Sequence, residues 1–248
     1  MASRVGRLRA VYSLMAEPPW PTLIVITMLG WGAMLLFSQE LALSSLCVAA
    51  TGAWYDQGWR SLQAMLAFVS PAHIALSWLL MLTAMMTPIL AGPLYHLWVR
   101  SLARRRWRAI GVFIAAYLVV WMGMAPVLVL FVALLRIAAT WFSVPVGGLA
   151  VAIALVWQAS PVKQFCLNRC HWTPRLGAFG WSADADCARY GLVNGLWCVG
   201  TCWALMLVPI TAIDMPMHLG LMVIIAVVMV IERLQPAKPV RWRFPVGR

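Results

Sequence analysis

Long stretches without charged residues constrain this chain more than any other feature of its sequence. Windows of about 18 uncharged, mostly apolar residues recur along it, and a helix of that length can cross the hydrocarbon core of a bilayer. Sixty-three per cent of the 248 residues are hydrophobic and only 10% are charged, whereas soluble domains are about half apolar and a quarter charged. The chain is therefore predicted to fold as helices within a membrane.

Six apolar segments predict an all-α, polytopic integral membrane protein, a bundle of about six transmembrane helices. The expected helices span residues 21–38, 71–98, 109–135, 144–158, 190–213 and 215–231. A shorter apolar segment, 41–53, is interpreted as an interfacial or re-entrant piece on the outer side. The predicted organisation is a cytoplasmic segment 1–20, a membrane domain 21–232 with a cytoplasmic loop 160–189, and a basic cytoplasmic tail 233–248.

The positions of lysine and arginine test this topology. Of the 19 basic residues, 17 precede the first segment, follow the last, or lie between the second and third or the fourth and fifth; only Arg60 and Arg136 fall on the other side. Because basic residues stay cytoplasmic, both termini are predicted to be cytoplasmic, in a bacterial inner (plasma) membrane. The net charge of +12 is then explained by basic clusters beside the ends of the segments, where anionic lipid of the inner leaflet attracts them. Nucleic acid is not an expected partner, because the basic clusters form no continuous stripe.

Three sulfur-bearing residues are spaced four apart in the fifth segment, which contains Cys198-Val-Gly-Thr-Cys202-Trp-Ala-Leu-Met206. At this spacing the side chains project from one side of a helix. Gly191 and Gly195 fall on the same face, in a small-x-x-x-small pattern that allows another helix to approach closely. The thiol face is therefore predicted to pack against a helix that supplies any remaining ligands. Sulfur without neighbouring carboxylates favours Cu(I), although cysteine can also act as a small hydrophobic residue.

Two other apolar segments contain candidate ligands. Met85 and Met86 precede Pro88 in the second segment, where proline interrupts the backbone hydrogen bonding of a helix; function and packing explain this unit equally well. Met217 and His218 open the sixth segment on the predicted outer side. Two polar residues also lie at or within the membrane boundary. Glu232 can reach water or pair with Arg233, and Asn194 is expected to hydrogen-bond between helices.

The predicted cytoplasmic loop contains two thiols and an imidazole within six residues, Cys166-x-x-x-Cys170-His171. Three such ligands are sufficient for Cu(I), and a fourth, Cys187, would complete a zinc tetrahedron. A reducing cytoplasm disfavours disulfides among these cysteines. The loop is therefore predicted to be either a copper transfer site or a zinc clip.

Together these groups predict a path for a soft cation across the membrane. Thioether and imidazole groups would lie outside, methionine and cysteine near the middle, and thiols with histidine inside. The candidate ligands are Cys198, Cys202, Met206, Met85, Met86, Cys166, Cys170, His171, Met217 and His218.

The chain resembles a bacterial family described as predicted metal-binding integral membrane proteins, otherwise of unknown function. The resemblance covers roughly residues 74–233. It rests on Ala84-Met85-Met86-Thr87-Pro88, on Tyr117 with Trp121, on Ser160-Pro161-x-Lys163-x-x-Cys166-Leu-x-x-Cys170, and on Gly195 through Met206. Members typically have Cys-x-Gly-Cys-Cys-Trp-Ala-Leu-Met in the last element, whereas this chain has Thr201 before its last cysteine and so lacks one candidate ligand. The resemblance implies metal binding, with copper as the metal.

Two classes of function compete. The leading hypothesis is a protein that holds, relays or inserts Cu(I) through Cys, Met and His ligands and exchanges it with a metal donor or acceptor protein. The alternative is a non-catalytic structural or assembly subunit of a larger membrane complex. A thiol-redox enzyme is a third hypothesis, although cysteines four apart on a rigid helix are poorly placed to form a disulfide. No catalytic triad, phosphate loop, carboxylate dyad or C-x-x-C-H haem motif occurs, so a hydrolase, an ATP-driven pump and a cytochrome c are not proposed.

Overall fold

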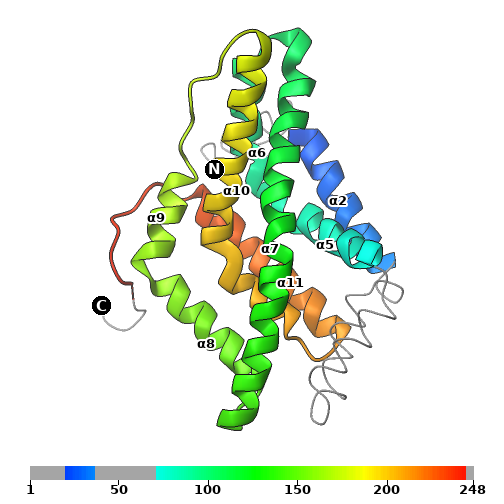
Figure 1. The fold of residues 1–248 in the computed structure, drawn as a ribbon, viewed down its shortest axis with the longest axis vertical. Coiled ribbons are helices and arrows are strands. Elements are labelled where there is room, and N and C mark those ends of the chain that lie inside the picture. The colour runs from blue at the N-terminus through cyan, green and yellow to red at the C-terminus, as the bar shows by residue number, and fades with distance from the viewer. Residues whose placement is uncertain (1–19, 37–70, 244–248) are drawn as a thin grey trace, which may run out of the picture.

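The structure, a computed structural model, describes residues 20–36 and 71–243. Within these ranges all regular elements are helical, which confirms the predicted all-α class for this part of the chain (Figure 1). The elements are α2 (Trp20–Leu36), α5 (Pro71–Met86), η1 (Pro88–Leu90), α6 (Ala91–Arg100), η2 (Ala103–Arg105), α7 (Arg106–Phe142), α8 (Val146–Ala159), α9 (Pro161–Arg169), α10 (Gly180–Ile210) and α11 (Met215–Leu234). The predicted re-entrant piece 41–53 lies outside the described residues.

Several of these helices have the length and apolar composition needed to cross a membrane. The helices containing α7, α10 and α11 each qualify unbroken, and two bent pairs raise the number to five if each pair counts as one span. The remaining apolar helix, α2, has 17 residues, slightly fewer than the roughly 18 that mark a membrane-spanning helix. The chain thus has the helices of a membrane protein, while the count of six spans and the placement of both termini in the cytoplasm stay predictions.

Two of the predicted segments are bent at prolines, and the bend at Pro88 agrees with the interruption expected there. The second segment bends by 55° between α5 and α6, and the fourth continues through a 66° bend into α9. Pro88 and Pro161 stand at the two breaks, where a missing N–H cannot continue the helical hydrogen bonding. Ser160 then caps α9, since its hydroxyl accepts a hydrogen bond from the Lys163 N–H at 3.1 Å. The predicted loop 160–189 therefore contains α9 and the first turns of α10.

The pair formed by α7 and α10 is the centre of the fold. In Figure 1, α7 runs along the molecule with α10 beside it. Their approach is close enough that a Cβ on Gly191 would lie 2.4 Å from the carbonyl oxygen of Phe113, and one on Gly195 would lie 3.0 Å from Val120. The prediction that the two glycines admit a neighbouring helix is confirmed, and that helix is α7.

The other helices surround this pair. Helices α8, α9 and α11 each pack against α10, while α5 packs against α2, α7 and α11. At the crossing of α2 and α5, a Cβ on Gly30 would lie 3.0 Å from the backbone nitrogen of Ala84. The buried ammonium of Lys163 pairs with Glu232 and so ties α9 to α11. Glu232 therefore pairs with Lys163, and not with its neighbour Arg233 as the sequence suggested.

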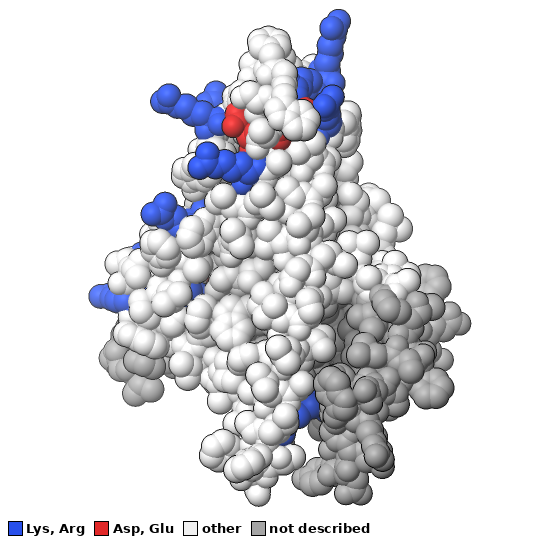
Figure 2. Space-filling view, viewed as in Figure 1, with Lys and Arg blue, Asp and Glu red and all other residues white. Residues whose placement is uncertain are grey.

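Charged groups collect at one end of the described chain. Figure 2 shows most Lys and Arg side chains around the tips of α7 and α10 and along the side formed by α9, with a wide uncharged surface below them and a small basic spot near the opposite end. At the tips, Arg105 and Arg108 contact the Asp184 carboxylate at 2.5 and 2.7 Å and join the start of α7 to the start of α10. Helix α7 has 37 residues and is therefore about 55 Å long, whereas a bilayer core is about 30 Å thick. The charged tips therefore extend beyond the length that lipid would cover.

We expect the substitution Gly191→Ala to destabilise the protein by about 1–3 kcal/mol, because an added methyl group would force α7 and α10 apart. Thermal unfolding of the purified protein in detergent measures the effect as a lowered Tm. Gly123→Ala is the matched control, since a Cβ at Gly123 meets no atom within 4 Å and alanine is the better helix former. Equal Tm values for the two variants would contradict the close helix crossing.

Candidate metal centre

The thiols of Cys198 and Cys202 form a buried pair inside the helix bundle. Their residues are 0% and 3% exposed, and their sulfur atoms lie 4.0 Å apart. Metal–thiolate bonds of about 2.3 Å, the length known for zinc, would span this separation with a sulfur–metal–sulfur angle of about 120°. Such an angle leaves a third coordination position open. The pair therefore suits a metal ion bound by two sulfur atoms and one further ligand.

Helix α7 brings two hydrogen-bond donors to Cys198. The hydroxyl of Tyr117 donates to the Cys198 sulfur at 3.1 Å. The indole N–H of Trp121 faces the same sulfur but makes no hydrogen bond of ordinary geometry. Trp121 is itself held by α5, because the indole N–H of Trp78 donates to its carbonyl oxygen at 3.1 Å. Donors of this kind orient a thiolate ligand and stabilise its negative charge.

Thr201 occupies the position at which the resemblance predicts a third cysteine. Its hydroxyl donates to the carbonyl oxygen of Cys198 at 2.8 Å and lies 3.2 Å from the sulfur of Cys202. The side chain is 5% exposed. A neutral hydroxyl group therefore stands beside the thiol pair.

A small hollow lies between Cys202 and the break in the second apolar segment. It is lined by Ile89, Leu167, Thr201, Cys202, Met229, Glu232 and Arg233. Ile89 belongs to η1, directly after the Met85-Met86-Thr87-Pro88 sequence. Cys202 of α10 and Ile89, which follows the bend after α5, therefore line one hollow, whereas Met85, Met86 and Cys198 are not part of its lining.

The predicted methionines are buried, but they are not polar partners of the thiols. Met85, Met86 and Met206 are at most 1% exposed and belong to the same hydrophobic core as the cysteine pair. Within the described ranges, the hydrogen-bond partners of Cys198 and Cys202 come from α7 and α10 and not from α5. Packing in the core therefore accounts for the burial of all three methionines.

The cysteines of α9 lie on different sides of α10. Cys166 packs directly against Gly200, where a Cβ would lie 2.7 Å from its sulfur. Gly200 is two residues from both Cys198 and Cys202 and therefore projects about 200° away from them. Cys170 instead reaches the guanidinium of Arg233, which donates to its sulfur.

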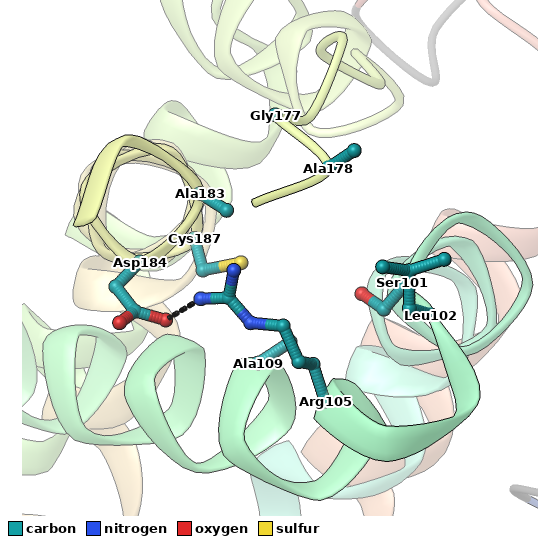
Figure 3. A pocket seen from close by; sticks show the side chains of 9 residues that line it. All are labelled: Ser101, Leu102, Arg105, Ala109, Gly177, Ala178, Ala183, Asp184 and Cys187. Carbon is teal, nitrogen blue, oxygen red and sulfur yellow. Dashed lines mark hydrogen bonds and ion pairs between the residues drawn. The ribbon is translucent and has the colours of Figure 1, made fainter. Parts of the chain in front are cut away.

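A zinc clip is not supported. His171 places its two ring nitrogens 3.1 and 3.0 Å from the carbonyl oxygens of Leu167 and Arg233, away from metal-ligand geometry with the cysteines. Cys187 lies elsewhere, in a second hollow beside Arg105 (Figure 3). Throughout residues 20–36 and 71–243, no three His, Cys, Asp or Glu side chains are grouped so that they could hold a metal ion. A three-ligand site at the thiol pair would therefore need a methionine or an external ligand.

The two candidate ligands at the start of α11 lie in different surroundings. Met217 is 46% exposed, whereas His218 is fully buried and places its Nδ1 atom 2.7 Å from the carbonyl oxygen of Pro209. Consecutive residues on a helix project about 100° apart, so the two side chains do not share a site.

Sequence reasoning missed Met229, and it treated Arg233 only as a basic anchor and a partner of Glu232. Both residues line the hollow beside Cys202. Met222 follows His218 by four residues, Met229 follows Met222 by seven, and Arg233 follows Met229 by four. These spacings place all four side chains on one face of the helix. That spacing, which ends in a charged residue on a buried helix face, is the feature that could have identified them.

Over the residues that the structure describes, these observations define an all-helical fold that has several apolar helices of membrane-spanning length and a buried pair of thiols at its centre. The chain belongs to the PpoB2 copper chaperone family, whose family model matches residues 75–247. The match includes the thiol pair, the tyrosine and tryptophan of α7 and the whole hollow. No curated protein and no solved structure matches the chain.

Alkylation should depend steeply on pH at Cys170. Burial raises the pKa of this thiol to about 12, although the neighbouring Arg233 guanidinium opposes the shift. Because only the thiolate reacts, the rate should rise about tenfold per pH unit from pH 8 to 10, whereas an ordinary thiol with a pKa of about 8.5 levels off near pH 9.

Mass spectrometry of peptides from iodoacetamide-treated folded protein gives this rate. The same peptide from denatured protein is the control and should level off at the ordinary pH. A rate at Cys170 of the folded protein that levels off near pH 9 would show that the thiol is not buried as described.

Proposed function

We infer that this protein binds Cu(I) within the membrane at Cys198 and Cys202 and passes it to another protein. The observation that carries the proposal is the 4.0 Å separation of two sulfur atoms on buried cysteines in a member of the copper chaperone family. Thiolates favour Cu(I) over harder cations, and Glu232, the carboxylate that lines the same hollow as Cys202, is paired with Lys163. Copper is the cargo in this proposal and is not a resident cofactor.

The third ligand is proposed to be the thioether of Met229. This side chain lines the same hollow as Cys202 and is 4% exposed. A thioether is soft, neutral and weaker than a thiolate, so it favours Cu(I) without holding it permanently. Exchange of this ligand for one from a partner protein would allow transfer of the copper. The Glu232 and Arg233 side of the hollow, at the end of α11, is the proposed entrance.

The membrane setting is proposed from the apolar helices and the distribution of charge. Five candidate spans, with α2 as a sixth, and the basic groups at one end (Figure 2) support a multi-pass protein of the bacterial inner membrane with both termini in the cytoplasm. The hollow would then open toward the cytoplasmic side, and lipid and a copper donor or acceptor protein are the proposed partners.

We expect the double substitution Cys198→Ser/Cys202→Ser to abolish copper binding at this site, because serine supplies no soft ligand. Purified full-length protein, loaded with Cu(I) under reducing, oxygen-free conditions, should retain about one copper per chain, and the double variant should retain almost none. Elemental analysis gives the stoichiometry, and X-ray absorption spectroscopy should show copper bound by sulfur alone.

Two single variants are matched controls for this experiment. Cys187→Ser removes a buried thiol from the separate hollow, and Cys166→Ser removes one from the opposite side of α10. Both should retain copper. Unchanged copper content in the double variant would refute the proposed site and would favour the alternative role as a structural subunit of a membrane complex.

A further inference from the structure

Arg233 places a positive charge beside the thiol pair. Its guanidinium donates to the sulfur of Cys170 and to the Asn194 side-chain oxygen, the latter at 3.2 Å. It lines the hollow together with Cys202 and is within electrostatic range of Cys198. An arginine that faces the interior of an apolar helix bundle is costly and commonly marks a functional site.

No carboxylate compensates this charge in the described part of the chain. Lys163, which is buried, pairs with Glu232, and Arg105 and Arg108 pair with Asp184. The partners of Arg233 are an amide oxygen and a thiol, which are uncharged groups because an ordinary thiol is mostly protonated at neutral pH. In the metal-free protein, the half-buried guanidinium of Arg233 thus lacks a carboxylate partner among the described residues.

Binding of copper changes this charge balance. When Cu(I) replaces the protons of Cys198 and Cys202, two protons leave to solvent and the metal with its two thiolates carries one negative charge. One guanidinium beside it makes the loaded site neutral. A divalent ion bound by the same two thiolates forms a neutral unit and leaves the guanidinium uncompensated, which is costly in an apolar interior.

We propose that Arg233 is the counter-cation of the metal-loaded thiol pair and that it gives the site its preference for monovalent over divalent soft cations. The proposal rests on the proposed function, because it requires metal binding at Cys198 and Cys202. It adds a specificity-determining residue that does not itself bind the metal.

The test compares a monovalent and a divalent soft ion that do not change oxidation state, Ag(I) and Cd(II). Affinities are measured by competition with chelators for full-length protein in lipid nanodiscs. Arg233→Met should weaken Ag(I) binding by about 30-fold or more, the effect of removing one partner of a buried charge pair, and should affect Cd(II) much less. The ratio of the two affinities should therefore fall by at least about tenfold.

Three further variants complete the experiment. Arg233→Gln is a second neutral variant that keeps a hydrogen-bonding side chain, so it should show the same fall in ratio. Arg233→Lys keeps the charge and should preserve most of the preference for Ag(I). Arg241→Met removes an equal charge from the exposed segment after α11 and should leave both affinities unchanged.

The outcomes separate this proposal from the proposed function. A wild-type protein that binds neither Ag(I) nor Cu(I) at the pair refutes the proposed function. A wild-type protein that binds Ag(I), combined with a folded Arg233→Met or Arg233→Gln variant that has the same affinity ratio, refutes only the role of Arg233. If neither neutral variant folds, two other results overturn the proposal. One is a loss of the Ag(I) preference in Arg233→Lys. The other is Cd(II) binding to the wild type that is as tight as Ag(I) binding.

Discussion

The close approach of α7 to α10 is the contact on which the rest of the site depends. Both helices begin at the charged end of the molecule and run in the same direction, so equal steps along each keep their side chains in register. Phe113 meets Gly191, and one turn later Tyr117 meets Gly195. The next turn brings Trp121 to Cys198. A side chain in place of Gly191 would separate the helices and withdraw both donors from the sulfur.

The spacing of residues within α10 was sufficient to predict the thiol face. A step of 100° per residue placed Gly191, Gly195, Cys198 and Cys202 together, and the structure confirms that this face is buried against a helix. The predicted role of Asn194 is also confirmed, since it accepts a hydrogen bond from Arg233 of α11. Such predictions need only the geometry of a single helix.

Contacts between helices could not be predicted from the spacing within one helix, because they depend on where each helix bends and on which helices pack against each other. The pairing of Glu232 with Lys163 requires α9 to fold back after the bend at Pro161. The zinc clip failed for a similar reason: Cys187 lies on the first turns of α10, beside Arg105, whereas Cys170 lies at the end of α9, beside Arg233. Cys170 and Cys187 are close in the sequence, but the two helices that contain or adjoin them place the two thiols in different surroundings.

Charge balance also gives a physical reason for Thr201. A third cysteine at this position would add a third thiolate to the loaded site and a second net negative charge, which the single guanidinium of Arg233 could not neutralise. The Thr201 hydroxyl stays neutral and is held by the carbonyl oxygen of Cys198, and the thioether of Met229 in the same hollow is neutral as well. Two thiolates, one monovalent cation and one guanidinium form a neutral unit, which is the arrangement an apolar interior tolerates best. The departure from the family pattern at Thr201 is therefore compatible with the proposed copper site and favours a monovalent metal there.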